Sequence, residues 1–180
     1  EKFLEKARHV EVQCLGDSHG NAIHLFDRDC SSQRRHQKLI EEAPAPAVDP
    51  VKRLETAEAA ARLLREAGYC GAATVEFLMD ANGDYSMLEV NTRVQVEHCV
   101  TEMVTGIDIV QASIRVAAGE PLGIDQSDIR LNGHSIECRI NAEDPDRDFM
   151  PQAGEVKTFV APGGLGVRMD SHVRSGYRIP

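Results

Sequence analysis

Polar side chains occupy alternate positions in the segment MLEVNTRVQVE, which runs from residue 87 to residue 97. Leucine, valine and threonine fill the positions between them, which is typical of a strand with one buried and one polar face. A solvated strand shows the same alternation, but two acids, two amides and an arginine suit ligand binding and proton transfer better than contact with water alone. Side chains on one face of a strand repeat about every 7 Å. The pattern predicts a row of ligands along a cleft, made of Glu89, Asn91, Arg93, Gln95 and Glu97.

A hairpin turn predicts which residue faces this row. The dipeptide Asn82-Gly83, a strong signal for a two-residue turn, separates the strand-like runs AATVEFLM and YSMLEV. Counting back from that turn places Glu76 opposite Glu89, where two carboxylates about 5 Å apart repel by about 3 kcal/mol at an effective dielectric constant of about 20. A cation or a shared proton must relieve this repulsion. With the amide oxygen of Asn91, the two carboxylates predict a Mg²⁺ or Mn²⁺ site; the alternative is a polar face that points to water.

Two further groups of residues suit an anionic substrate. Arg93 offers a planar fork for a carboxylate or bicarbonate, and Glu97 could act as a base on the bound anion. A same-face ion pair of little energetic value is the alternative, and the pattern alone does not separate the two. A basic cluster near the predicted metal hairpin favours a phosphate or bicarbonate ligand over a solvated loop, because the chain as a whole is acidic. This cluster comprises Gln33, Arg34, Arg35, His36 and Lys38.

The composition limits the classes of protein and of partner. The chain has 180 residues, a net charge of -9 and 42% hydrophobic residues, which is enough for one substantial core and part of a second. The acidic balance argues against nucleic acid as the main partner, and no apolar run or signal peptide indicates a membrane. Five cysteines without a C-x-x-C pair predict reduced thiols and a cytoplasmic location. The chain starts without methionine and stops after a strand-like run, so we expect it to be part of a longer protein.

The elements that must position these residues are predicted from local signals. A hairpin is expected early in the chain, and His9 and Glu11 on its first strand are interpreted as a common surface pair. Each predicted helix begins after an aspartate cap and ends near a glycine. The first part of the chain is predicted to be α+β, and the part after residue 131 to be the start of a β-rich domain. The expected elements are strands at 8–15 and 22–27, a helix from Asp49-Pro50 to Gly68, and a helix from Asp108 to Ala118.

Four motifs carry a resemblance to a known family. RHVEVQ, RDCSSQRRHQKLIEEAPAP, EVNTRVQVEHCVTEM and IECRINAEDP resemble the biotin carboxylase component of biotin-dependent carboxylases, and the likeness extends over essentially the whole chain. The resemblance implies the C-terminal lobe of an ATP-grasp fold over residues 1–131, followed by the truncated start of the biotin carboxylase C-terminal domain over residues 132–180. In that family ATP and bicarbonate give carboxyphosphate, whose CO₂ passes to biotin on a carrier.

The resemblance also implies roles for individual residues. The opening EKFL, which is Glu1, Lys2, Phe3 and Leu4, resembles the hinge strand that holds adenine. Nucleotide-contacting positions match His9, Gln33 and His36, and the metal ligands match Glu76, Glu89 and Asn91. The bicarbonate and biotin site matches Lys38, Arg93, Gln95, the backbone of Val96, and Arg139. Glu97 matches the base that deprotonates bicarbonate, and Arg139 the residue that steadies bicarbonate and the biotin enolate.

The same resemblance implies partners and leaves alternatives open. A biotin carboxyl carrier, a carboxyltransferase and a second copy of the parent protein are expected partners, in an acetyl-CoA or related acyl-CoA carboxylase. The family's N-terminal domain and its other ATP-grasp lobe do not precede Glu1 in this sequence, so the chain alone is expected to be inactive. The alternatives are a non-catalytic folding or subunit-contact fragment, and another bicarbonate-using ATP-grasp ligase such as carbamoyl-phosphate synthetase.

Overall fold

The computed structural model describes residues 3–180 and divides the chain into two compact units. The first unit extends to Arg139 and the second runs from Ile140 to Pro180. Glu1 and Lys2, which were expected to help hold adenine, lie outside the described residues. Phe3 and Leu4 precede the first strand, and Phe3 is exposed.

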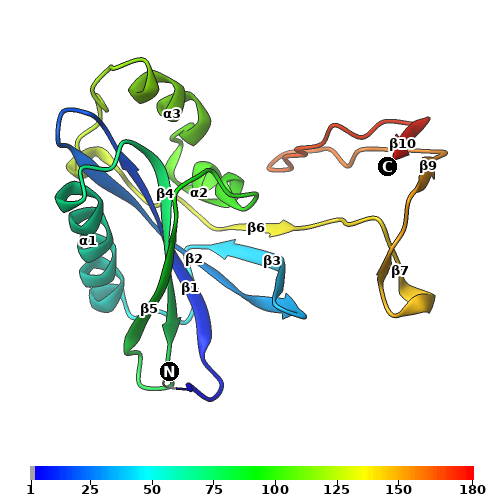
Figure 1. The fold of residues 1–180 in the computed structure, drawn as a ribbon, viewed down its shortest axis with the longest axis horizontal. Coiled ribbons are helices and arrows are strands. Elements are labelled where there is room, and N and C mark those ends of the chain that lie inside the picture. Colours follow the sequence, from blue (N-terminus) through cyan, green and yellow to red (C-terminus); the bar gives the residue numbers. More distant parts are fainter. Residues whose placement is uncertain (1–2) are drawn as a thin grey trace. The chain divides into compact units, whose positions relative to one another are not determined.

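A six-stranded antiparallel sheet is the framework of the first unit (Figure 1). Its strand order is β5-β4-β1-β2-β3-β6, so β1 joins the consecutive strands β1, β2 and β3 to the β4–β5 hairpin, and β6 pairs with the other side of β3. The strands are β1 (Arg8–Gly16), β2 (Ala22–Arg34), β3 (Gln37–Ala43), β4 (Gly71–Met79), β5 (Tyr85–Asn91) and β6 (Ser135–Cys138).

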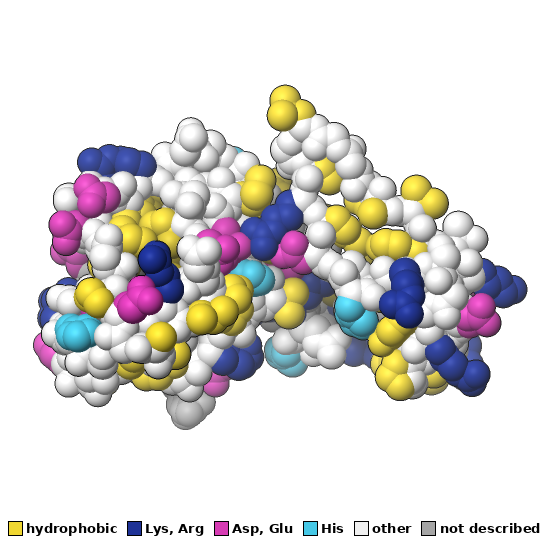
Figure 2. Space-filling model, turned by 90° about the horizontal axis from the view of Figure 1, so that it is seen from above, with side chains coloured by type: hydrophobic (Ala, Val, Ile, Leu, Met, Phe, Trp, Pro, Cys, Tyr) yellow, Lys and Arg dark blue, Asp and Glu magenta, His cyan; other side chains and the backbone are white. Residues whose placement is uncertain are grey.

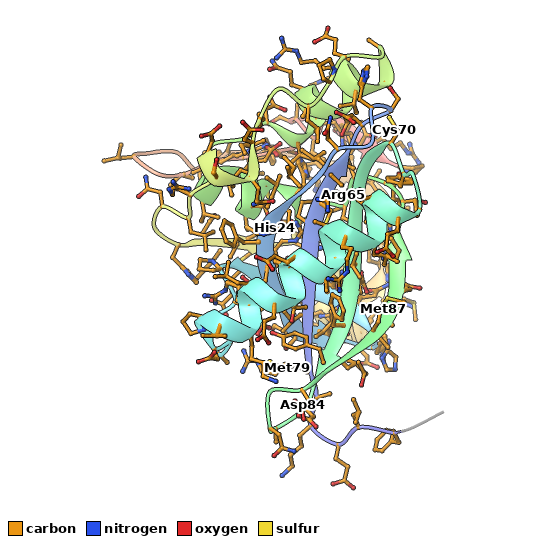
Figure 3. All side chains as sticks on the ribbon, turned by 90° about the vertical axis from the view of Figure 1, so that its left-hand side faces the viewer. His24, Arg65, Cys70, Met79, Asp84 and Met87 are labelled. Carbon is orange, nitrogen blue, oxygen red and sulfur yellow. The ribbon has the colours of Figure 1, made fainter. Side chains whose placement is uncertain are left out.

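Helix α1 (Pro50–Glu66) lies across one face of this sheet (Figure 3). Its start is fixed as predicted, because the side chain of Asp49 accepts hydrogen bonds from the amides of Val51 and Lys52, and proline occupies the first turn. Small residues on its inner face let the helix approach the sheet closely. The core between them contains Val12, Cys14, Ala57, Ala60, Leu64, Ala73 and Val75.

The opposite face of the sheet is apolar at one end and polar at its centre. Helix α3 (Ile109–Ala117) covers the apolar end, where Ile109 packs with Leu15 and Ile23. Helix α2 (His98–Thr105) and the short helix η1 (Gln126–Asp128) complete the elements of the first unit. Alternate residues of β1 are therefore buried on opposite sides, and the side that faces α2 carries glutamate and glutamine instead of valine.

The β4–β5 hairpin has the expected carboxylate pair but a different turn. Glu76 lies opposite Glu89, as predicted. The loop is one residue longer than the predicted two-residue turn, since the amide of Asp80 bonds the carbonyl of Asp84 across three residues. A bulge at Leu88 then shifts the register by one residue and restores the expected pairing. The predicted register is correct because these two irregularities cancel.

The basic stretch 33–38 is the tip of the β2–β3 hairpin, not an irregular loop. Strand β2 runs on to Arg34, beyond the predicted end at Asp27, and β3 begins at Gln37. Arg35 and His36 form the turn between them, both with positive φ angles, of 52° and 62°. Such a turn matches the twist of the paired strands but is rarely made by residues other than glycine, asparagine and aspartate. The hairpin brings Lys38 back onto the sheet.

The second unit is β-rich, as predicted, and contains only short elements. Strand β7 (Glu143–Asp144) pairs with β8 (Met150–Pro151), β9 (Gly154–Val156) pairs with β10 (Tyr177–Ile179), and η2 (Pro145–Arg147) follows β7. The compact units divide after Arg139 because β6 pairs with β3 in the large sheet. The division of the family's domains near residue 131 stays a prediction.

No helix among residues 3–180 is long and apolar enough to cross a membrane.

Candidate active site

A buried polar network occupies the centre of the sheet face that α2 covers. Arg28 on β2 is fully buried, and its guanidinium donates hydrogen bonds to five side chains. The shortest, 2.6 Å, joins its Nε to Oε1 of Glu11. A buried charge of this kind is tolerated only when its partners satisfy it, and loss of the oppositely charged partner of a buried ion pair costs about 3–5 kcal/mol. The other acceptors are Gln13 on β1, Thr74 on β4, Gln95, and Thr101 on α2.

Lys38 joins this network to three carboxylates. Its Nζ lies 2.6 Å from Oε2 of Glu11, 2.7 Å from Oε1 of Glu76 and 2.7 Å from Oε1 of Glu97. Burial by itself would lower the pKa of Lys38, but the neighbouring carboxylates, Glu11 foremost, outweigh it and raise that pKa well above its usual value. Lys38 is therefore a fixed cation that holds three strands and the start of α2 together. Such a cation is suited to bind an anion, not to transfer a proton.

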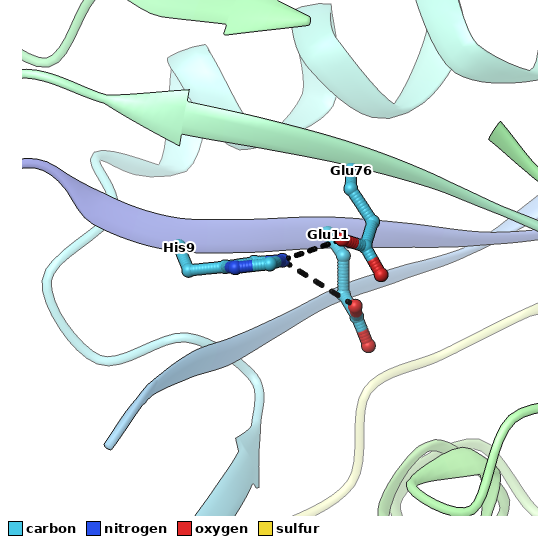
Figure 4. Close-up of side chains that lie close together, drawn as sticks. All are labelled: His9, Glu11 and Glu76. Carbon is cyan, nitrogen blue, oxygen red and sulfur yellow. Dashed lines mark ion pairs between the residues drawn. The ribbon is translucent and has the colours of Figure 1, made fainter. Parts of the chain in front are cut away.

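His9, Glu11 and Glu76 point toward one another above β1 and β4 (Figure 4). The Nε2 atom of His9 lies 2.9 Å from Glu76 and 3.9 Å from Glu11. Burial alone would raise the pKa of Glu76, but His9 and Lys38, which lie against its carboxylate, lower that pKa well below its usual range. These three residues also approach the geometry of a metal site. The ammonium of Lys38 already lies against both carboxylates, which makes a cation unnecessary there.

The three predicted metal ligands lie together at the end of the β4–β5 hairpin. The Nδ2 atom of Asn91 donates to Glu76 at 3.0 Å and to Glu89 at 3.3 Å, while its Oδ1 accepts from Arg93 at 3.2 Å. Without a metal, the amide therefore relieves part of the repulsion between the two carboxylates. Rotation of this amide by half a turn would direct its oxygen toward them and complete the hard oxygen set that Mg²⁺ prefers. The residues present fit such an ion.

The row after Asn91 does not continue as a strand. Strand β5 ends at Asn91, the chain bends at Arg93, and α2 begins at His98. Gln95 and Glu97 are buried, while Arg93 and the side chain of Val96 are exposed, so the prediction of one continuous polar face is wrong. Strand β5 lies at the edge of the sheet, and its pairing with β4 stops at Thr74 and Asn91. The bend brings Glu97 back over the centre of the sheet.

Glu97 lies between two cations. Its Oε1 contacts Lys38 and its Oε2 accepts a hydrogen bond of 2.7 Å from Nη2 of Arg139. Burial would raise the pKa of Glu97, but Lys38 and its hydrogen bond lower it overall. The structure therefore brings together the predicted Lys38, Glu97 and Arg139, although they come from β3, the turn before α2 and the end of β6. Arg93 contacts Asn91 and the backbone of Val94 rather than this group.

The other predicted residues lie in different parts of the site. Gln33 places its Nε2 3.0 Å from Nδ1 of His9, and Gln95 donates to Glu76 at 2.9 Å. His36 lies at the exposed tip of the β2–β3 hairpin. On the face shown in Figure 2, acidic, basic and apolar side chains are interspersed over the surface.

Sequence reasoning missed several residues of the network. The interpretation of His9 and Glu11 as a surface pair is wrong, because Glu11 is fully buried beneath Lys38. The signal that could have found it is the alternation in HVEVQC, where glutamate and glutamine interrupt a run that is otherwise buried. Arg28 and Glu41 were missed because their strands were ended too early or treated as loop. The network also includes Gln13, Thr74 and Thr101.

Comparison with known families agrees with this architecture. The family described as "Carbamoyl-phosphate synthase L chain, ATP binding domain" matches residues 1–125, and the family described as "Biotin carboxylase C-terminal domain" matches residues 137–180. The biotin carboxylase of Pseudomonas aeruginosa is 60% identical over 180 residues, which are 100% of this chain and 40% of that protein. This chain belongs to the biotin carboxylase family.

Other members of the biotin carboxylase family are similarly close. The biotin carboxylase of Allochromatium vinosum is 58% identical over 100% of this chain and 40% of its own length. The biotin carboxylase domain of a thermophilic 2-oxoglutarate carboxylase, solved bound to bicarbonate, has a TM-score of 0.97 at 50% identity and covers 100% of this chain and 41% of that one. The chain thus spans about two fifths of the length of these relatives. The predicted ATP-grasp lobe and the start of a biotin carboxylase C-terminal domain are confirmed.

Proposed function

We propose that the full-length protein is a biotin carboxylase, in which this chain supplies the bicarbonate site, the metal ligands and part of the nucleotide site. ATP and bicarbonate would form carboxyphosphate, whose CO₂ passes to a nitrogen of biotin on a carrier domain or protein. The observation that carries the proposal is the group formed by Lys38, Glu97 and Arg139, in which one buried carboxylate touches two cations at 2.7 Å.

Bicarbonate would bind by sharing these cations with Glu97. An incoming anion competes with the carboxylate for Lys38 and Arg139, and as it draws Lys38 away, Glu97 loses the main contact that lowers its pKa. Glu97 then accepts the proton of bicarbonate, and the resulting dianion attacks the γ-phosphorus of ATP while ADP leaves. The substrate itself thus switches the carboxylate from an ion-pair partner to a base.

Glu76, Glu89 and Asn91 are the proposed ligands of Mg²⁺ or Mn²⁺, with Arg93 adjacent to them on the exposed side. When bound, the ion would neutralise charge on the phosphate oxygens of ATP. His9, Gln33 and His36 are proposed to contact the nucleotide, with the segment that precedes β1 beside the adenine. The hydrogen bond between Gln33 and His9 would fix the orientation of the imidazole ring.

Arg139 is proposed to steady biotin after carboxyphosphate forms, with Gln95 and the backbone of Val96 completing the bicarbonate site. The proposed partners of the full-length enzyme are a biotin carboxyl carrier, a carboxyltransferase and a second copy of the enzyme. An acyl-CoA carboxylase of fatty acid synthesis is the proposed setting. The five cysteines are free thiols, which supports a reducing compartment such as the cytoplasm.

The proposal is tested on the purified full-length enzyme by ADP release in the presence of Mg-ATP, bicarbonate and free biotin. We expect ADP release to require bicarbonate and to rise when biotin is added, with carboxybiotin formed in equal amount. ADP release that is independent of bicarbonate, or bicarbonate-dependent release without any carboxybiotin, would contradict the proposed function.

A further inference from the structure

Glu41 on β3 is a buried carboxylate that the proposed reaction does not use. It is fully buried in the structure, and its Oε1 lies 2.7 Å from Nε of Arg139. Burial of a carboxylate is costly unless a cation lies beside it, and Arg139 is the cation that lies beside Glu41. The same guanidinium also contacts Glu97, through Nη2. Arg139 therefore lies between two carboxylates, of which Glu97 is the proposed base.

The two contacts differ in their alignment. The bond from Nη2 to Glu97 is a directed hydrogen bond of 2.7 Å. Among the described residues, Nε of Arg139 and both carboxylate oxygens of Glu41 have no aligned hydrogen bond, although the charges touch. The guanidinium is thus oriented to donate a hydrogen bond to Glu97. Its contact with Glu41 is an ion pair without an aligned hydrogen bond. A small rotation would align Nε with Glu41 while Nη2 leaves Glu97.

The surroundings of Glu41 give it no other cation at contact distance among the described residues. Glu137 lies directly opposite it across the β3–β6 pair, and its Oε2 accepts from the thiol of Cys99 at 2.6 Å. Burial raises the pKa of Glu41 to about 7, against the opposing effect of Arg139, and Glu137 and Glu97 add to the rise. Two carboxylates, Glu41 and Glu97, thus contact the guanidinium of Arg139, and its orientation decides which of them receives an aligned hydrogen bond.

We propose that Glu41 is a positioning residue that retains Arg139 when the substrate anion draws its guanidinium away from Glu97. This inference rests on the proposed function and deepens it. In the resting site Arg139 is bonded to Glu97. When bicarbonate or biotin binds, Arg139 turns on its Nε toward Glu41, its Nη atoms serve the substrate, and Glu97 is released to act as a base.

The absence of the Glu41 charge would change the resting state as well. An arginine beside a single carboxylate tends to bind it with two parallel hydrogen bonds. Without Glu41, Arg139 could donate hydrogen bonds to Glu97 from both Nε and Nη2. Its guanidinium would then be unavailable to the substrate anion, and the charge of Glu97 would remain neutralised. Loss of the carboxylate at position 41 is therefore expected to lower turnover and kcat/KM for biotin, and to leave nucleotide affinity unchanged.

The first test is Glu41→Gln in the full-length enzyme, because glutamine keeps the size of the side chain and removes its charge. We expect kcat/KM for free biotin to fall by about ten- to a hundred-fold, the range expected for a misplaced catalytic group, while Mg-ATP affinity stays within about two-fold. The matched control is Glu42→Gln on the same strand, whose carboxylate pairs with exposed His134 at 2.9 Å. The control should retain wild-type kinetics.

A double-mutant cycle separates positioning from general structural support. If Glu41 acts through Arg139, Glu41→Gln should cause almost no further loss in an Arg139→Met background. Losses that multiply in the double variant would overturn the inference. If Glu41→Gln does not fold, Glu41→Asp keeps the charge but draws it back by one methylene, and unchanged kcat/KM for biotin in that variant would also overturn it.

The same experiments distinguish this inference from the proposed function. A wild-type enzyme without biotin-dependent ADP release would overturn both. An active wild-type enzyme with a Glu41→Gln variant of equal kcat/KM for biotin would overturn only the role of Glu41. A loss confined to Mg-ATP affinity would likewise place Glu41 outside the positioning of Arg139.

Discussion

At the scale of single residues, two cations of the site contact four carboxylates. Lys38 contacts Glu11, Glu76 and Glu97, and Arg139 contacts Glu97 and Glu41. Glu97 is the one carboxylate among the described residues that both cations touch. Its charge compensation therefore depends on both cations, so an anion that recruited either of them would raise the basicity of Glu97 without moving it.

The first prediction concerns Glu97. Glu97→Gln in the full-length enzyme should lower bicarbonate-dependent ATP cleavage by about a hundred-fold or more, the usual scale for loss of a general base. Mg-ATP affinity should be nearly unchanged, because Glu97 contacts neither the proposed metal ligands nor the segment expected at adenine. The measurements are ADP release at saturating ATP and calorimetric titration of Mg-ATP. If affinity collapsed while bicarbonate-dependent turnover survived, Glu97 would belong to the nucleotide site.

The second prediction separates metal binding from folding. Glu89 is exposed and bonds only Asn91 among the described residues, whereas Glu76 is buried against Lys38 and His9. Glu89→Gln should therefore leave thermal stability in the absence of metal at least as high as that of the wild type, because the substitution removes the repulsion from Glu76. The Mg²⁺ concentration for half-maximal ATP turnover should rise by at least about ten-fold, since even outer-shell changes cost that much. Unchanged Mg²⁺ dependence would contradict the ligand assignment.

At the scale of elements, the sequence predicted the features that depend on residues close together in the chain. The aspartate cap and proline of α1, the first hairpin and the Asn82-Gly83 turn region were all legible in the sequence. The burial of Glu11, the pairing of β3 with β6 and the place of Glu41 were not, because they depend on contacts between residues far apart in the chain. The facing pair Glu76 and Glu89 was predicted through register. Glu97 as a base and Lys38 in a basic cluster were also predicted from the residues, whereas Arg139 came only from the resemblance.

The third prediction concerns the loop that closes the β1–β2 hairpin. Asp17 accepts hydrogen bonds from the backbones of His19, Asn21 and Leu122 and from the Asn21 side chain, and so ties the loop to the segment after α3. Burial alone would raise the pKa of Asp17, but these hydrogen bonds lower it to about 2. A carboxyl with a lowered pKa stabilises the fold above its unfolded value of about 4, and this contribution is lost as the pH falls toward 2.

This loop is tested with Asp17→Asn in urea unfolding across the acidic range. The variant should be less stable than the wild type at neutral pH, and the difference in the free energy of unfolding should shrink between about pH 4 and pH 2. Asp84→Asn is the matched control, since Asp84 is exposed and its partner is the surface residue Lys52. A stability difference that stays constant with pH would show that the charge of Asp17 is not the cause.

At the scale of the whole molecule, the chain would supply one side of the proposed site. It spans about two fifths of its relatives, and the sheet face that carries Lys38 and Arg139 is covered at its centre, within the described residues, only by α2 and the turn before it. Phosphoryl transfer depends on enclosure that positions the reacting groups and excludes water. The polar network explains how this side keeps its shape, because Arg28 crosslinks three strands and α2.

The fourth prediction follows from that division. The isolated chain should bind Mg-ATP more weakly than the full-length enzyme and show no biotin-dependent ATP hydrolysis, because the nucleotide would contact only part of its site. Calorimetry and ADP release on both proteins, at equal concentration and with the same Mg²⁺, give the comparison. Turnover by the isolated chain near the full-length rate would contradict it.

The bulge at Leu88 has a consequence for how this hairpin can vary among related sequences. Register between Glu76 and Glu89 is set at the bulge, which lies on the site side of the bonded pair Asp80 and Asp84. Deletion of Ala81 would leave Asn82-Gly83 as a two-residue turn between the same two aspartates, and the strands below would keep their pairing. Insertions and deletions at the tip are thereby uncoupled from the carboxylate pair. The length of the loop can therefore change while Glu76 and Glu89 remain opposite each other.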